Sequence, residues 1–111
     1  MDQEERERRR LFSNNPQYQG IDEGDLIAYE GNRVGIFYNH ERIFRLFEVG
    51  SYGSINVLVA WPMPYYGAAK AVFIYQGVIC LIYTHYDFRS TIIHLLSYDE
   101  TNHQLVTIKT F

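Results

Sequence analysis

The sequence predicts an all-β fold, mainly antiparallel, forming a sandwich or small barrel of about seven to eight strands after a short N-terminal helix or arm. Three observations indicate this class. Short runs rich in β-branched and aromatic residues, which pack well on a pleated surface, follow one another from Leu26 to Phe111. Tight-turn residues separate these runs. The order of runs and turns in residues 25–61 resembles that in residues 70–109, so each half is expected to be a four-stranded meander.

The expected strands follow from the turn residues that bound them. Gly31-Asn32 fits a two-residue hairpin whose first position needs positive φ, and Gln76-Gly77 holds the corresponding place in the second half. Asp99 to Asn102 suits a four-residue type I turn. The predicted strands are 26–30, 33–38, 42–49 and 55–61, then 71–75, 78–83, 91–98 and 104–109. The halves resemble each other either through an ancient duplication or because antiparallel meanders are generally alike.

The chain of 111 residues is long enough for one hydrophobic core. Residues 1–20 are expected to be a charged helix or arm with a linker, and residues 21–111 a single β domain. In the arm, acids come first and bases last, which complements a helix dipole. Arg8, Arg9 and Arg10 are candidate contacts for phosphates or an acidic partner. The alternative is a solvated arm, since acidic residues in the same segment offset the arginines.

Adjacent apolar pairs in the second half, such as Ile92-Ile93 and Leu95-Leu96, are typical of strands covered on both faces. The first meander, the N-terminal helix or another subunit could supply the two covering layers. Four strands per half also resemble a propeller blade, and residues 97–105 resemble the outer hairpin of such blades. Two blades cannot close a ring, so a propeller would require oligomerisation.

One cysteine cannot form an intramolecular disulfide, and the chain shows neither a leader nor a membrane-spanning apolar run of about 20 residues. A cytoplasmic, reducing location without membrane contact is therefore expected.

The stretch from Glu23 to Asn39, followed by Arg42 to Phe47, resembles the opening hairpins of SH3-like small barrels. It is also similar to a segment of the papain-like superfamily that contains cell-wall amidases and lecithin:retinol acyltransferases. That resemblance implies a catalytic pair in which a histidine, placed directly before a Val-Gly pair, is the general base for a cysteine nucleophile. Arg33 holds its place here, and a guanidinium cannot accept a proton. The resemblance thus implies a degenerate relative without the catalytic histidine.

No catalytic, cofactor or metal site is predicted. Cys80, His85 and Asp87 are the residue types of a nucleophile, a base and an orienting group, but Cys80 is expected to face inward as a core thiol, with His85 in a turn. None of the four histidines forms a His-x-His pair, and one cysteine cannot form a Cys-x-x-Cys pair.

Aromatic residues are abundant in expected loops, where tyrosine offers a rigid contact with a polar tip. The densest group lies between Trp61 and Gly67, where Pro62 and Pro64 stiffen the chain. The alternative is that this connection folds back over the core. The candidate partner-binding residues are Trp61, Met63, Tyr65, Tyr66, Tyr86 and Phe88.

Two functions are compatible with these features. The first is a non-enzymatic protein-interaction module of the inhibitor, immunity or accessory type, including a viral antagonist of a host factor, that binds another protein or forms a homo-oligomer. The second, less favoured, is a nucleic-acid or small-ligand binder on a small barrel, with stacked Tyr and Phe and phosphate contacts from arginines. Those arginines are Arg33, Arg42, Arg45 and Arg89. Pairing of these arginines with acidic residues would count against the second function.

Overall fold

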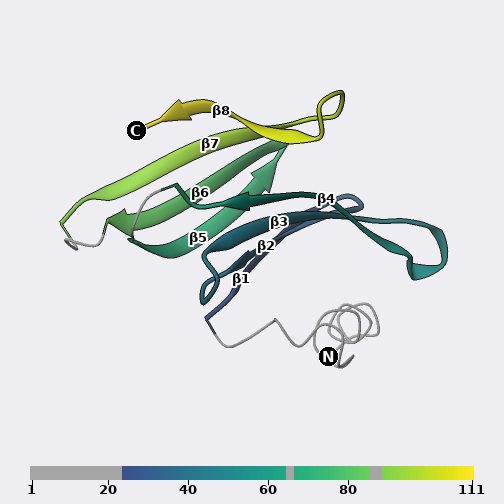
Figure 1. Ribbon diagram of the computed structural model, residues 1–111, viewed down its shortest axis with the longest axis horizontal. Coiled ribbons are helices and arrows are strands. Elements are labelled where there is room, and N and C mark those ends of the chain that lie inside the picture. The colour runs from purple at the N-terminus through teal and green to yellow at the C-terminus, as the bar shows by residue number, and fades with distance from the viewer. Residues whose placement is uncertain (1–23, 65–66, 86–88) are drawn as a thin grey trace.

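The computed structural model describes residues 24–64, 67–85 and 89–111. This part of the chain forms two four-stranded antiparallel sheets, each a simple meander (Figure 1). The first sheet contains β1 (Leu26–Glu30), β2 (Arg33–Tyr38), β3 (Ile43–Val49) and β4 (Ile55–Pro62). The second contains β5 (Gly67–Tyr75), β6 (Val78–His85), β7 (Thr91–Asp99) and β8 (Gln104–Thr110). A short 3₁₀ turn, Ser51–Gly53, lies between β3 and β4.

The all-β prediction and the two meanders are confirmed. Most strand bounds agree with the sequence to within a residue or two. The main difference is β5, which begins at Gly67 and not at residue 71, because Gly67 to Ala69 already pair with the end of β6. The helix or arm expected over residues 1–20 lies outside the described residues. The described part of the chain contains no helix with the length and apolarity needed to cross a membrane.

The two short hairpins have the backbone geometry that their turn residues require. Gly31, between β1 and β2, has φ +59°, as expected from its position. In the β5–β6 turn both Gln76 (φ +50°) and Gly77 (φ +80°) are left-handed, as in a type I′ turn. The expected turn at residues 99–102 is shifted by one, since Asp99 still pairs with Gln104 and the loop ends on left-handed His103 (φ +53°).

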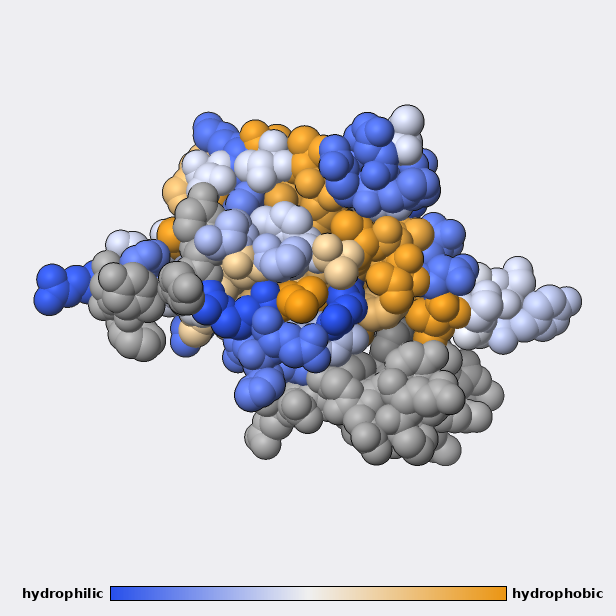
Figure 2. Space-filling view, in the orientation of Figure 1, coloured by the Kyte–Doolittle hydropathy of each residue, from blue (hydrophilic) through white to orange (hydrophobic). Residues whose placement is uncertain are grey.

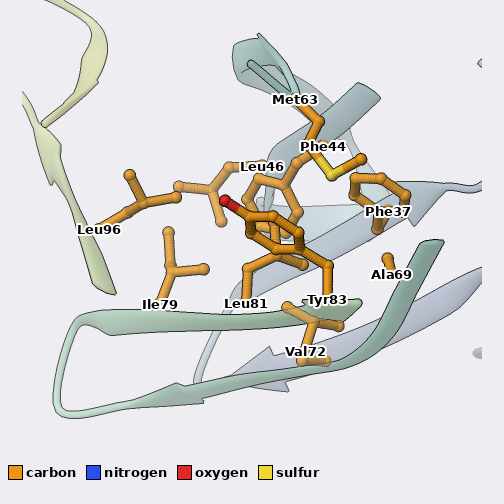
Figure 3. Close-up of a cluster of buried hydrophobic side chains, with 11 residues drawn as sticks. Phe37, Phe44, Leu46, Met63, Ala69, Val72, Ile79, Leu81, Tyr83 and Leu96 are labelled. Carbon is orange, nitrogen blue, oxygen red and sulfur yellow. The ribbon is translucent and has the colours of Figure 1, made fainter. Parts of the chain in front are cut away.

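The core lies between the two sheets. Phe37, Phe44 and Leu46 of the first sheet are buried in one cluster with Leu81 and Tyr83 of the second (Figure 3). The remaining buried members of the cluster are Ala28, Met63, Ala69, Val72, Ile79 and Leu96. All these side chains lose contact with water, which is the main favourable term in folding. The two sheets therefore form one domain body around a shared core.

Gly35 allows the two sheets to approach each other. A Cβ atom at this position would lie 2.6 Å from Cζ of Phe44 and 3.2 Å from Cδ1 of Ile74 on the second sheet. The ring of Phe44 thus occupies the space that a side chain on β2 would fill. Glycine is required here by close packing, not by an unusual backbone angle.

A second, smaller buried cluster lies on the face of the first sheet that points away from the second. It consists of Val34, Ile36 and Phe47. Partly buried Tyr38, Val49 and Ile55 surround it. The first sheet is therefore apolar on both faces. The sequence predicts this property for the second sheet, from its adjacent pairs of apolar residues.

Candidate interaction surface

The outer face of the second sheet is the face turned away from the core. Strand register gives it three central rows across the four strands, because directly paired residues point to the same side. Polar pairs continue the face at its two ends, Asp99–Gln104 beyond the first row and Thr84–Thr91 beyond the third. Tyr75, Val78, Ser97 and Val106 form the first row. Phe73, Cys80, Leu95 and Lys109 form the second. Ala71, Ile82, Ile93 and Phe111 form the third.

Ten of these twelve positions carry apolar residues, and only Lys109 carries a charge. A sheet face that remains in water is normally polar, so that alternate residues differ in character. Here Phe73 is 55% exposed and Tyr75 is 72% exposed. Exposed apolar surface of this extent is typical of a contact surface.

Cys80 lies at the centre of this face, half-buried in the middle of β6. Desolvation raises the pKa of its thiol, so the thiolate is disfavoured. The prediction that Cys80 faces the core is wrong. Its neighbours Ile79 and Leu81 are buried in the core, and the two-residue period of a strand therefore turns Cys80 outward.

The one charged side chain of these three rows lies over an aromatic ring. The Nζ atom of Lys109 lies 4.6 Å from the centre of the Phe111 ring, a cation–π contact. On the side of the molecule shown in Figure 2, hydrophobic surface is exposed near β8 and over part of β4, beside the hydrophilic β7–β8 turn.

A polar cluster joins the two sheets at the start of β2. The Nη2 atom of Arg33 donates to Oε1 of Glu100 in the β7–β8 turn at 2.6 Å, and its Nε lies 3.6 Å from Oε2 of Glu48. The guanidinium also lies over the ring of Tyr98, 5.2 Å from its centre. Arg33, which was predicted as a phosphate contact, is therefore paired with two carboxylates.

The β7–β8 turn beside this cluster is held by Asp99. Its Oδ1 accepts hydrogen bonds from the backbone N–H groups of Thr101 (3.0 Å) and Asn102 (3.2 Å), and Oδ2 accepts one from the Asn102 side chain (2.8 Å). The Asn102 side-chain bond is the main cause of the lowered pKa of this carboxyl. The negative charge stabilises the turn.

Arg45 is also paired. Its Nη2 atom lies 3.3 Å from Oε2 of Glu41, and its guanidinium lies over the ring of Tyr38 at 4.9 Å. Arg33 and Arg45 are thus both paired with acidic residues, and such pairing counts against a phosphate-binding face.

The predicted aromatic loop begins on the core side of β4. Trp61 belongs to β4, where it pairs with Phe44, so both side chains point to the core side. Met63 is 8% exposed and belongs to the main core cluster. Its backbone N–H donates to the carbonyl of Arg42 at 3.0 Å. Of the two arrangements considered for this connection, the buried Met63 and the core-side Trp61 favour the one in which it folds back over the core, and strand pairing continues through Pro62.

Trp61 contacts the one buried polar side chain of the described core, His94 on β7. The two rings meet edge to face with centres 5.2 Å apart. Nε2 of His94 lies 2.8 Å from Oγ1 of Thr107 on β8, within hydrogen-bond distance. Burial lowers the pKa of His94, which favours the neutral ring. This arrangement links β4, β7 and β8 around a buried ring.

Several predicted site residues lie outside the described residues. They are Arg8, Arg9, Arg10, Tyr65, Tyr66, Tyr86, Asp87 and Phe88. Among the described residues, no group of three or more histidine, cysteine or acidic side chains could hold a metal ion.

Comparison of the chain with protein-family models, with curated proteins and with solved structures gives no match.

Proposed function

We propose that the protein is a protein-interaction module that binds through the outer face of its second sheet. The observation that carries this proposal is the apolar character of that face, on which Phe73 and Tyr75 are largely exposed. Aromatic side chains are enriched at the centres of protein interfaces and contribute most of the binding energy there. Nucleic-acid binding would instead require a positively charged surface.

A role in binding, not catalysis, is supported by the chemistry of the candidate groups. Cys80 has a raised pKa in the middle of a strand, whereas nucleophilic cysteines have lowered values. Arg33 stands where the papain-like resemblance implies a base, and it is bound to Glu48 and Glu100. Inhibitor, immunity and accessory roles are all compatible with a surface of this kind.

Site-specific photocrosslinking tests the proposal. Tyr75 is replaced by p-benzoylphenylalanine, and the full chain is irradiated in lysate of its native cells. Tyr52, fully exposed in the β3–β4 connection, is the matched control because it is an aromatic residue outside the face. We expect discrete protein adducts from position 75 and none from position 52. Absence of adducts at position 75, or equal adducts at both positions, would contradict the proposal.

A further inference from the structure

The two sheets repeat the same construction. Both begin with a two-residue hairpin, closed by the pairs Glu30–Arg33 and Tyr75–Val78. In both, the third and fourth strands contain a register shift at the same place. In the first sheet the shift follows Leu46, two residues before Glu48, which pairs with Arg33. In the second sheet it follows Leu95, two residues before Ser97, which pairs with Val78. This common register makes each residue of one sheet equivalent to a residue of the other.

The equivalence shows that the sheets are stacked front to back. Gly35 and Cys80 are equivalent, since each is two residues beyond the closing pair of its hairpin. Gly35 faces the core against Phe44 and Ile74, whereas Cys80 lies on the outer face. The outer face of the second sheet is thus the same side of the meander that, in the first sheet, already packs against another sheet.

The outer face is large enough and neutral enough to pack on a further sheet. Its strands contain seven to nine residues. With a strand spacing of about 4.8 Å and a rise of about 3.3 Å per residue, the whole face, including its polar ends, has a footprint of roughly 500 Å², of which the three apolar rows cover about 300 Å². Two copies paired over the whole face would bury roughly 1,000 Å², the lower limit for a specific interface. Within the three rows Lys109 is the one charged side chain, and its amine is already placed over Phe111.

The other free face of the molecule is less available. On the outer side of the first sheet the central side chains are already removed from solvent, with Ile36 at 0% and Phe47 at 7% exposure, and its exposed apolar residues, such as Ile27 and Val57, lie on the edge strands β1 and β4. A head-to-tail stack of copies would need that face as the acceptor. The open face of one molecule is therefore matched best by the same open face of a second molecule, which is an isologous, two-fold arrangement.

We infer that the outer face of the second sheet is the interface of a weak two-fold dimer, in which two copies of this chain stack face to face. This inference rests on the proposed function, and it specifies the partner as a second copy. Dimerisation covers the second side of β5 to β8, which explains why these strands carry apolar residues on both faces.

Sedimentation equilibrium of the full chain over a range of concentrations tests the stoichiometry. We expect a reversible monomer–dimer equilibrium. The variant Phe73→Thr/Tyr75→Thr should weaken it at least tenfold, because it removes the two most exposed aromatic side chains of β5 from the interface. The control variant Ile27→Thr/Val57→Thr changes exposed residues on the other free face and should leave it unchanged. Circular dichroism checks that both variants are folded.

Cys80 supplies a second measurement without any substitution. Because it lies at the centre of the face, its alkylation by a small maleimide should slow as the concentration of the wild-type chain rises. In the Phe73→Thr/Tyr75→Thr variant the rate should not depend on concentration. A wild-type chain that stays monomeric, assemblies larger than a dimer, or dissociation only in the control variant would each overturn the inference.

The photocrosslinking experiment separates failure of the inference from failure of the proposed function. An adduct at position 75 with twice the 13.1 kDa mass of the chain supports the dimer. Adducts to other proteins alone would retain the proposed function and overturn the dimer. Absence of any adduct would contradict both.

Discussion

The carboxylate of Glu30, at the end of β1, accepts hydrogen bonds from the backbone of Gln76 in the β5–β6 turn. The distance to the N–H of Gln76 is 2.6 Å, and the second carboxylate oxygen lies 2.9 Å from the backbone nitrogen of Gly77. Both residues have positive φ, so their N–H groups point to one side and form a small anion-binding nest. One side chain of the first sheet thereby holds a turn of the second.

Removal of this carboxylate should destabilise the protein. We expect Glu30→Ala to lower the free energy of unfolding by about 1–2 kcal/mol, because two charge-assisted hydrogen bonds are lost. Glu30→Gln should cost about half as much, since an amide oxygen can still accept one of them. Urea denaturation measures both values. Glu41→Ala is the control, since Glu41 is exposed and pairs only locally with Arg45 at i,i+4. If the two alanine variants lose equal stability, Glu30 does not act as a clamp between the sheets.

The contact between Glu30 and the β5–β6 turn illustrates which features of the fold the sequence predicts and which it does not. Strand bounds and hairpin turns depend on neighbouring residues, and the Gly31 and Gln76 turns were therefore predictable. The partner of Glu30 lies 46 residues away, and nothing local in the sequence indicates it. The face of Cys80 was predicted wrongly for a related reason. A strand that is apolar on both sides gives no periodic signal for which side meets the core.

The same reasoning applies to the interaction surface. Paired apolar residues indicated that the second half is apolar on two faces, as the register shows. They could not show that the first sheet covers only one of them, because this depends on how the meanders stack. The outer face that includes Phe73, Cys80 and Leu95 became recognisable as a surface only when the register was known.

A methyl group at position 35 should disturb the contact between the sheets. In Gly35→Ala the new Cβ would lie 2.6–2.8 Å from two atoms of the Phe44 ring, which is fully buried and has little room to move. We expect a loss of about 1–3 kcal/mol in the free energy of unfolding, as is usual for overpacked cores. Denaturant titration gives this value. In the double variant with Phe44→Leu, the added cost of the alanine should be smaller, because the smaller side chain makes room for it. An equal cost in both backgrounds would show that the ring is not the obstacle.

The Arg33 cluster should contribute modestly and in a salt-dependent way. Glu100 is largely exposed, so Glu100→Gln should cost less than about 1 kcal/mol and less still at high salt. Arg33→Ala should cost more, because it also removes the pairing with Glu48 and the contact with the Tyr98 ring. Thermal unfolding at low and high salt measures both effects. If Glu100→Gln is as harmful as Arg33→Ala, the Glu100 pair accounts for the whole contribution of Arg33.

His94 should make the stability of the protein depend on pH. Its ring is 3% exposed, and burial lowers its pKa from the ordinary value of 6.5, so the folded protein binds a proton less readily than the unfolded chain. In the pH range between the lowered value and 6.5 the unfolded state therefore carries more protons, and stability rises with pH. The contribution is fully present above pH 6.5 and is lost as the solution is acidified.

The variant His94→Gln removes the titrating group while leaving a side chain that can bond to Thr107. We expect lower stability at neutral pH, since the edge-to-face contact with Trp61 is lost, together with a flatter pH profile below 6.5. Urea unfolding at a series of pH values measures the slope. His40→Gln, at an exposed turn position, is the control and should retain the wild-type slope. A wild-type slope in His94→Gln would mean that another group causes the acid sensitivity. A flat wild-type profile would mean that the buried ring titrates equally in the folded and unfolded chains.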